Sequence, residues 1–328
     1  MEEGVKLNNI QHQETVKKAV MPRFRGHTAL KSRTIPRYPE SAERELRRAV
    51  NQYLRTINAE LKDRLPGILV AYRTEQRGDS RFDDFADFER IVRQIFQEIA
   101  ASLEQKLDEV LLIQRMASAG LMTKNTAIRE WRRAVQKTLG IDLMEDYYSG
   151  DFYKQEMQLW VDVNVLKIKS IPNTMLDEMK QIILDGYTLG KTIRQIQKEI
   201  QKSYNVTKQK ADMLARDQIA TLNAQITQYQ QRDAGVSRYE WSTSRDERVR
   251  DCHAALEGMT FSWDAPPEMW YTTKKKGIVF TGRHCHPGED YQCRCCAIPV
   301  FDIETIDVPM APEDAGKGQR RTDGEKRK

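Results

Sequence analysis

The 328-residue chain has no long hydrophobic run, and its longest uninterrupted apolar stretch is Ile68 to Tyr72. A membrane-spanning helix needs about 20 apolar residues, so this absence argues against a transmembrane protein. The first residues, Met-Glu-Glu-Gly-Val-Lys, lack the apolar segment of a signal peptide, and we expect none. With 31% charged residues and a mean hydropathy of -0.69, the composition instead predicts a soluble, charge-rich protein.

Cysteine is also scarce, and the five cysteines are an odd number. In a chain that is not secreted, an odd count indicates reduced thiols or metal ligands rather than a disulfide framework. Several enzyme signatures are missing as well: the zinc deaminase motif, His-Glu-x-x-His, a phosphate-cradling glycine loop and Gly-x-Ser-x-Gly. We therefore expect a protein that is not an enzyme.

Positive charge is modest overall but uneven along the chain. The net charge is +5, while residues 1–37 carry eight Lys/Arg against three Glu and residues 317–328 carry six against two acids. Basic ends on a nearly neutral body are typical of contact with nucleic acid or an acidic protein surface. The alternative is a pair of solvated tails with no partner.

Apolar residues recur at three- and four-residue steps from residue 39 onward, which predicts amphipathic helices. The first is expected to end at Pro66-Gly67, and Arg77 to Ser80 is expected to connect it to a second helix from Phe85 to Leu111. A third helix is predicted from Thr123 to Leu139. Residues 141–155 are expected to form a bend, while residues 1–37 lack a sustained period and suggest an extended arm.

The next segment is harder to assign, because Val161, Val163 and Val165 alternate as in a strand although residues 154–168 otherwise suit a helix. Ile171-Pro172 is expected to begin a new helix. A further helix is predicted after Gly190, and Val206-Thr207 is expected to cap a separate last helix that ends at Ala234-Gly235.

After residue 235 the pattern changes from helical periodicity to short alternating segments and turns. Short strands are predicted at residues 237–243, 260–263, 277–280 and 297–301, with a short helix at residues 246–256. The fold class is therefore α+β, with a mostly helical N-terminal region and a small C-terminal domain of short antiparallel strands. The expected division is a basic arm (1–38), a helical region (39–235), a Cys/His domain (236–303) and a disordered charged tail (304–328).

The Cys/His domain concentrates soft metal-ligand side chains. All five cysteines and three of the five histidines lie between Cys252 and Cys296. In an extended segment, Cys293 and Cys295 point to one side and can share a metal. The predicted site is one closed structural zinc held by two thiols and two imidazoles, in a domain with few large apolar side chains. Its predicted ligands are His253, His286, Cys293 and Cys295.

Other interpretations of these side chains stay open. Four further residues compete as ligands: Cys252, His284, Cys285 and Cys296. The cysteines could instead be ordinary core residues beside surface histidines. A Cys/His pair could act as nucleophile and base, and Asp246 with Glu247 near His253 could indicate a metal-dependent nuclease, although charges at a helix start are usually caps.

Four blocks of sequence carry a resemblance to a known family. They are Ala215-Arg216-Asp217-Gln218 through Asn223 and Gly235; Tyr239-Glu240-Trp241-Ser242-Thr243-Ser244; Asp246-Glu247-Arg248-Val249-Arg250 with His253, Leu256 and Gly258; and His286-Pro287-Gly288-Glu289-Asp290-Tyr291-Gln292-Cys293-Arg294-Cys295 with Pro299. In their order and spacing, they resemble the Mu F-like family of phage head morphogenesis (minor capsid) proteins over about residues 170–303. Three cysteines, Cys252, Cys285 and Cys296, lie outside these motifs.

The resemblance implies a low-copy virion component that is made in the host cytoplasm and joins the phage or prophage head early in assembly. It implies a place in the head interior or at the portal vertex, in procapsid assembly and in DNA packaging or ejection. The implied partners are the portal protein, the major capsid or scaffolding protein, and viral double-stranded DNA through the basic termini. The alternative function is a zinc-dependent DNA-binding or nuclease protein; the zinc itself is argued from ligand chemistry and not from the resemblance.

Overall fold

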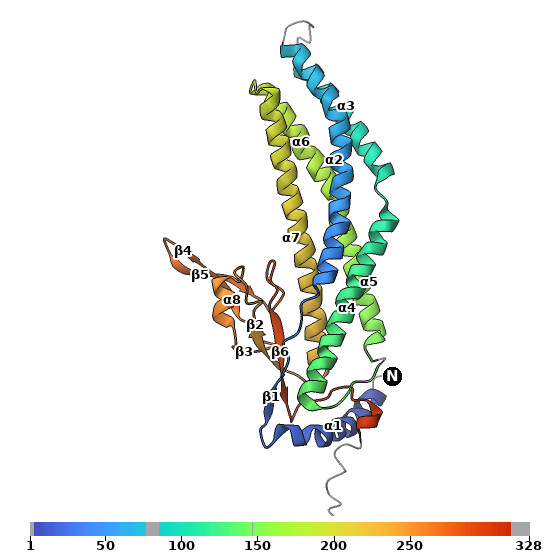
Figure 1. Ribbon diagram of the computed structural model, residues 1–328, viewed down its shortest axis with the longest axis vertical. Coiled ribbons are helices and arrows are strands. Elements are labelled where there is room, and N and C mark those ends of the chain that lie inside the picture. Colours follow the sequence, from blue (N-terminus) through green and yellow to red (C-terminus); the bar gives the residue numbers. More distant parts are fainter. Residues whose placement is uncertain (1–2, 77–84, 146, 316–328) are drawn as a thin grey trace, which may run out of the picture. The chain divides into compact units, whose positions relative to one another are not determined.

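The structure is a computed structural model that describes residues 3–76, 85–145 and 147–315 (Figure 1). The chain divides into two compact units, each assembled from segments that are distant in the sequence. Unit 1 contains Met1–Glu40, Gly120–Met157 and Asp217–Lys328, and unit 2 contains Ser41–Ala119 and Gln158–Arg216. The functional division at residues 38, 235 and 303 stays a prediction.

Unit 2 consists of helices that pack through apolar stripes, as the periodicity predicts. They are α2 (Glu40–Gln76), α3 (Phe85–Lys106), the first part of α4 (Glu109–Leu139), the later part of α5 (Asp151–Lys169), α6 (Ile171–Thr188) and the first part of α7 (Ile193–Asp233). Ile57 on α2 and Phe88 and Ile99 on α3 are fully buried. Polar contacts join the same helices: Asn51 on α2 donates to Asp212 on α7 at 2.9 Å, and α2 also binds α3 through Glu60.

Two helices are longer than expected, because tertiary burial outweighs local stop signals. Pro66 lies inside α2, where it removes one backbone hydrogen bond, yet Leu61 and Ile68 on either side of it are buried. The expected break at Val206-Thr207 is also absent. Thr207 donates its hydroxyl to the Ser203 carbonyl one turn earlier, at 3.1 Å, so it lies inside α7 rather than capping a new helix.

One predicted helix is instead too long: the helix expected from Phe85 to Leu111 is interrupted after α3. Asp108 accepts a hydrogen bond from the Leu111 backbone N–H at 2.9 Å and caps a new helix, α4. That helix continues to Leu139, so the predicted third helix is only its second half.

The ambiguous segment is a helix, α5, with two interleaved apolar stripes. Val161, Val165 and Ile168 are buried, four and three residues apart. Leu159, Val163 and Leu166 have the same spacing but are 58%, 40% and 68% exposed. The apparent strand-like alternation of the valines arises because both faces of this helix are apolar.

The expected extended arm is wrong, because residues 3–24 form helix α1 (Glu3–Phe24). Val16, Val20 and Phe24 are buried at four-residue steps, and His12 Nε2 is 2.9 Å from the Val308 carbonyl oxygen. These contacts within unit 1 explain why a segment of weak overall amphipathicity is helical: a few apolar side chains meet the C-terminal segment.

Unit 1 also contains a four-stranded antiparallel sheet in the order β1-β6-β2-β3. Its strands are β1 (Ala29–Lys31), β2 (Arg238–Ser242), β3 (Thr260–Ser262) and β6 (Cys296–Asp302), and a short helix, α8 (Asp251–Leu256), connects β2 to β3. The ring of Trp131 on α4 stacks on Phe301 of β6 at 5.8 Å. The α+β fold class is confirmed.

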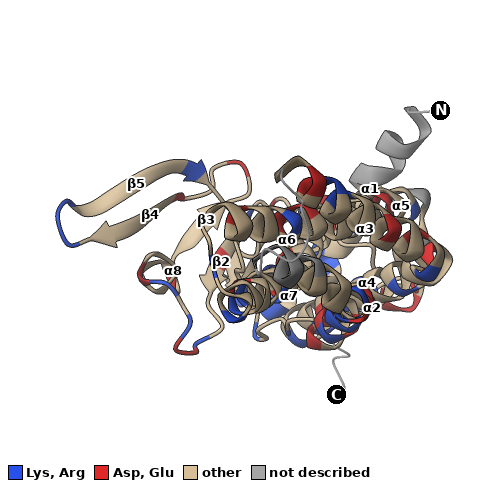
Figure 2. Ribbon diagram, turned by 90° about the horizontal axis from the view of Figure 1, so that it is seen from above, with Lys and Arg blue, Asp and Glu red and all other residues tan. Residues whose placement is uncertain are grey.

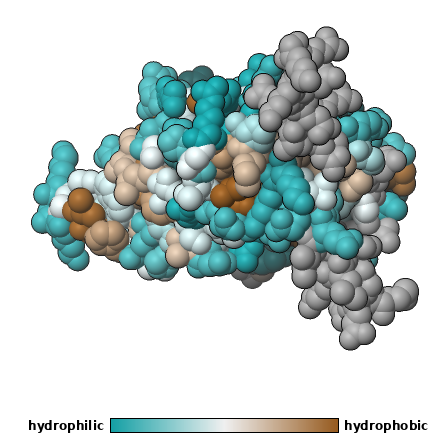
Figure 3. Space-filling view, turned by 90° about the horizontal axis from the view of Figure 1, so that it is seen from below, coloured by the Kyte–Doolittle hydropathy of each residue, from teal (hydrophilic) through white to brown (hydrophobic). Residues whose placement is uncertain are grey.

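A separate hairpin of β4 (Glu268–Thr273) and β5 (Gly277–His284) extends from unit 1, and β4 was not predicted. Figure 2 shows basic residues at its turn, which is Lys274-Lys275-Lys276. Ile278 and Phe280 on β5 are 57% and 62% exposed, and Figure 3 shows the brown surface at this end beside hydrophilic atoms. The strand β4 is hard to recognise because few of its side chains are buried, so a two-faced alternation is weak.

The segment after β6 is ordered as far as residue 315, which differs from the expected disordered tail. Ile306, Val308 and Met310 are buried, and the short helices η1 (Tyr147–Ser149) and η2 (Pro312–Asp314) lie in unit 1 as well. Gly235 turns the chain after α7 with a φ of +70°, and a Cβ there would lie 1.8 Å from the Thr305 carbonyl oxygen. The predicted connection at 77–80 and the remaining tail, 316–328, lie outside the described residues. No helix in the described ranges is long and apolar enough to cross a membrane.

Candidate metal centre

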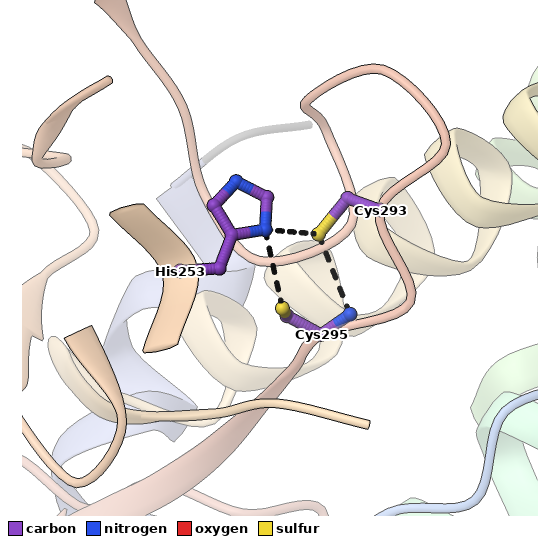
Figure 4. Close-up of side chains that lie close together, drawn as sticks. All are labelled: His253, Cys293 and Cys295. Carbon is purple, nitrogen blue, oxygen red and sulfur yellow. Dashed lines mark hydrogen bonds between the residues drawn. The ribbon is translucent and has the colours of Figure 1, made fainter. Parts of the chain in front are cut away.

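Three of the four predicted ligands meet in a buried cluster (Figure 4). His253 comes from α8, Cys293 from the loop before β6, and Cys295 from the residue preceding that strand. The Nδ1 atom of His253 is 3.6 Å from the Sγ atom of each cysteine. The possible ligand atoms lie within 4.8 Å of one another, and no other such group of three occurs among the described residues.

The loop that carries Cys293 is shaped by its packing on α7. Gly288 has a φ of +92°, and a Cβ there would lie 3.0 Å from the Ala224 side chain, so glycine fits this close approach. The backbone N–H of Gln292 donates to Asp217 on α7 at 3.0 Å. The Sγ atom of Cys293 then accepts backbone N–H groups from Gly288 and Cys295, each at 3.4 Å. The sulfur is thus held where a thiolate is stabilised.

A buried carboxylate, Asp290, determines which nitrogen of His253 faces the sulfurs. Its Oδ2 lies 3.1 Å from Nε2 of His253, and its other oxygen accepts from Arg283 at 2.6 Å, while Arg250 also pairs with it. In the neutral ring, an acceptor at Nε2 places the proton there and leaves the lone pair of Nδ1 toward the cysteines. This carboxylate–histidine arrangement is the one that supports histidine ligands in metal sites.

The pKa values of the three clustered side chains depend on one another. Burial acts to lower the pKa of His253, but hydrogen bonds to Asp290 and Cys293 raise it to about 9. Hydrogen bonds from Cys295 and His253 hold the pKa of the Cys293 thiol well below its usual range. The pKa of Cys295 is raised, because it donates to Cys293 and because burial disfavours a second charge. These shifts favour a Cys293 thiolate beside a protonated His253.

Aromatic residues close the cluster from the side of the sheet. The ring of Trp241 on β2 contacts His253 edge to face at 5.4 Å. Its indole N–H is buried and has no hydrogen-bond acceptor of ordinary geometry among the described residues. The hydrogen bond to Cys293 and burial raise the pKa of Cys295. The indole N–H of Trp241 acts to lower that pKa, but by less. A thiolate at Cys295 would satisfy this indole group.

The fourth predicted ligand, His286, is placed differently. Its Nδ1 lies 2.9 Å from the hydroxyl of Tyr239, and its ring packs against Trp263 at 4.8 Å. Its backbone N–H donates to Glu289 at 2.7 Å, and burial lowers the pKa of the ring. His286 therefore orders the Pro-Gly turn from inside the core and is not part of the three-residue cluster.

The competing side chains each have other contacts. Cys252 accepts the backbone N–H of Trp270 at 3.4 Å, Cys296 donates to the Arg294 carbonyl at 3.8 Å, and His284 Nδ1 is 3.1 Å from a backbone carbonyl on the surface. Cys285 is buried, which raises its thiol pKa to about 11. All five cysteines are free thiols.

Sequence reasoning missed the supporting role of Asp290 and its two arginines. Asp290 lies inside the fourth block of the resemblance, three residues before Cys293, and this position could have indicated its role. Asp246, which suggested a nuclease, pairs with Arg248 and Arg294 instead. Its pKa is lowered by these contacts, against the effect of burial, so it is a surface ion-pair residue.

Taken together, fold and site define an α+β protein in which a small antiparallel sheet carries a buried cluster of two thiols and one imidazole beside a long helix. Residues 177–298, from within α6 to within β6, match the family described as Phage Mu protein F like protein. The resemblance to the Mu F-like family of phage head morphogenesis proteins is thus confirmed for this part of the chain.

A relative from Haemophilus influenzae, named only as an uncharacterized protein, is 27% identical over 240 residues. The match covers 73% of this chain and 50% of the relative, so the chain spans about half the length of the curated relative it matches. The comparison with solved structures found no match. Activity and partners of the whole protein are therefore matters for proposal.

Proposed function

We propose that this chain is a minor head protein of a phage or prophage, which joins the portal vertex during procapsid assembly and acts in DNA packaging or ejection. The observation that carries this proposal is the Mu F-like match over residues 177–298, which includes α7, the strands β2 and β3, the start of β6 and the cysteine cluster. The family is one of head morphogenesis proteins, so the role is structural, with other capsid components as partners and the virion as the place of action.

An exposed stripe on α5 supports a protein partner for the helical region. Leu159, Val163 and Leu166 are largely exposed on a helix whose other face is already buried. A helix that is apolar all round is normally covered on every side. Large exposed apolar side chains in one row are typical of protein–protein contacts. We assign this stripe to contact with the portal protein.

The test uses the full chain, since a fragment of residues 40–235 would divide unit 1. Leu159→Gln with Leu166→Gln should abolish co-purification with the portal protein made from the same phage genome. The control is Ile278→Thr with Phe280→Thr on the exposed hairpin, which should leave co-purification unchanged. If only the hairpin variant loses co-purification, the portal contact lies in the small domain instead. Immunolabelling of intact virions tests the location in the head, and absence of label together with absence from purified virions would overturn the proposed role.

Contact with packaged DNA is the finer part of the proposal, and it rests on the basic ends. Lys17 already pairs with Glu304 at 3.0 Å, so part of the N-terminal charge is used within unit 1. We expect the six basic residues of 317–328 to contact DNA. Their replacement by Gln should reduce retention on duplex DNA at low salt. The control is Lys274, Lys275 and Lys276 changed to Gln, and equal retention by both variants and the wild type would remove DNA from the list of partners.

The alternative, a zinc-dependent nuclease, has one observation in its favour: Cys293, His253 and Asp290 form a chain resembling nucleophile, base and orienting acid. All three side chains are buried, which leaves no access for a polymer substrate. Incubation with supercoiled DNA and divalent metal ions distinguishes the two functions. Metal-dependent cutting that is lost in His253→Ala would favour the enzyme over the structural head protein.

A further inference from the structure

We propose that His253, Cys293 and Cys295 hold one structural zinc ion, that Asp290 supports the site from behind His253, and that His286 is not a ligand. This inference is independent of the head function. It revises the ligand set that the sequence predicts and adds a carboxylate that the sequence did not assign.

The donor atoms themselves select the class of ion. Two thiol sulfurs and one imidazole nitrogen, all within 4.8 Å of one another and all buried, are soft to borderline donors. Such sets suit zinc and exclude the hard ions calcium and magnesium, which take oxygen ligands. A core position would not need both sulfurs to lie 3.6 Å from the same ring nitrogen of His253.

The surroundings give a second and independent indication. Asp290 Oδ2 lies 3.1 Å from Nε2 of His253, so a neutral, metal-bound ring would carry its proton on the side away from the sulfurs. Two backbone N–H groups point at Cys293 Sγ, and the indole N–H of Trp241 remains without an ordinary acceptor beside the cluster. All of these groups are donors or orienting acceptors that a pair of zinc-bound thiolates and a neutral imidazole would satisfy.

The position of the cluster explains what the ion would do. It would join α8 to the start of β6, which are 40 residues apart at His253 and Cys293. Asp290 extends the link, because it also binds Arg283 at the end of the β4–β5 hairpin and Arg250 at the start of α8. One ion would thus connect the hairpin base, the short helix and the sheet. The three protein ligands leave the fourth position of a tetrahedral site to a water molecule, and because all three ligands are buried we assign the ion a stabilising role.

The first experiment measures zinc in the purified full-length chain by elemental analysis. We expect one zinc per chain, lost in His253→Ala, Cys293→Ser and Cys295→Ser. The matched control is Cys296→Ser, which changes the adjacent cysteine and should retain the metal. Substoichiometric zinc that is the same in Cys293→Ser would overturn the proposal, and so would a Cys293–Cys295 disulfide in place of metal.

Two further measurements remain decisive if a ligand variant fails to fold. Cobalt(II) added to the metal-stripped wild-type chain should show thiolate-to-metal charge transfer and tetrahedral ligand-field bands, and their absence would overturn the site. His286→Gln should keep full zinc stoichiometry, whereas loss of zinc there with retention in His253→Ala would reverse the ligand assignment.

Asp290→Asn tests the supporting carboxylate separately from the ligands. The amide can still accept a hydrogen bond from His253 but lacks the charge. Zinc should still bind at saturation with affinity lowered about 10–100-fold, the usual effect of losing such a partner. An unchanged affinity in a competition with a chromophoric chelator would contradict the role of Asp290.

Discussion

The helices of unit 2 and the sheet of unit 1 are stabilised by different kinds of side chain. In unit 2, the fully buried residues are aliphatic or aromatic, as at Leu54, Ile57 and Phe88. The core beside β2 and β6 instead combines four cysteines with large side chains such as Tyr239, Trp241 and Trp263. The helices therefore depend on apolar burial distributed over many turns, whereas the sheet packs aromatic side chains around the cluster for which we propose a metal. The difference teaches that one chemical change can affect the sheet while leaving the helices folded.

The largest expected effect is the removal of the proposed zinc. Binding of a structural zinc contributes about 10 kcal/mol or more in small zinc domains, so a chelator should unfold the sheet region. Near-ultraviolet circular dichroism should lose the signal of the buried tryptophans, while the far-ultraviolet helix signal persists. Identical melting curves with and without chelator would contradict the idea that zinc stabilises the sheet region.

A change in the core of unit 2 should have the next largest effect, in the opposite region. Ile99→Ala deletes a fully buried side chain of α3 and should lower the free energy of unfolding by about 2–5 kcal/mol. Zinc content should stay the same, since this residue belongs to the other unit. Thermal unfolding and elemental analysis on the same sample check both statements, and loss of zinc would show that the two regions are not independent.

A smaller effect is expected at Glu60, whose pKa is lowered by hydrogen bonds from Lys106 and Ser102. A carboxylate with a lowered pKa in the folded state stabilises the protein above its unfolded pKa, and this contribution disappears as pH falls through the folded value. Glu60→Gln should therefore lower the free energy of unfolding by about 0.5–1 kcal/mol at pH 7, a small effect because Lys106 is half exposed. In acid, the substitution should leave the free energy of unfolding unchanged. Denaturant unfolding at several pH values measures it, and an equal loss at every pH would contradict the assignment.

The smallest effect on stability is expected on the exposed stripe of α5. Leu166→Gln should change the free energy of unfolding by no more than about 0.5 kcal/mol, because this side chain is 68% exposed. Val165→Gln on the buried face of the same helix is the matched comparison and should be strongly destabilising. Equal effects of the two substitutions in thermal melts would mean that the stripe is buried in the folded chain.

Helical periodicity was a good guide to which segments are helical and a poor one to where helices end. The stripes of α2, α3 and α7 could be read directly, because apolar residues at three- and four-residue steps produce one buried face. The helix ends could not be predicted in this way. The free energy lost at Pro66 is smaller than the free energy gained by burying Ile68, and the Thr207 hydroxyl finds its acceptor inside the helix. Helix α1 was missed for the related reason that three buried side chains, and not a continuous stripe, hold it.

By itself, the sequence determined the α+β class, the positions of β2, β3 and β6, and the pairing of Cys293 with Cys295 on one side of a short segment. These features depend on spacings of a few residues. Only the tertiary structure decided that His253 and not His286 faces the sulfurs and that Asp290 orients it. The reason is physical: the side that each buried histidine faces depends on how the loop of Pro287 and Gly288 packs on β2 and α7 and meets α8, over separations of 40 residues or more that no local pattern encodes.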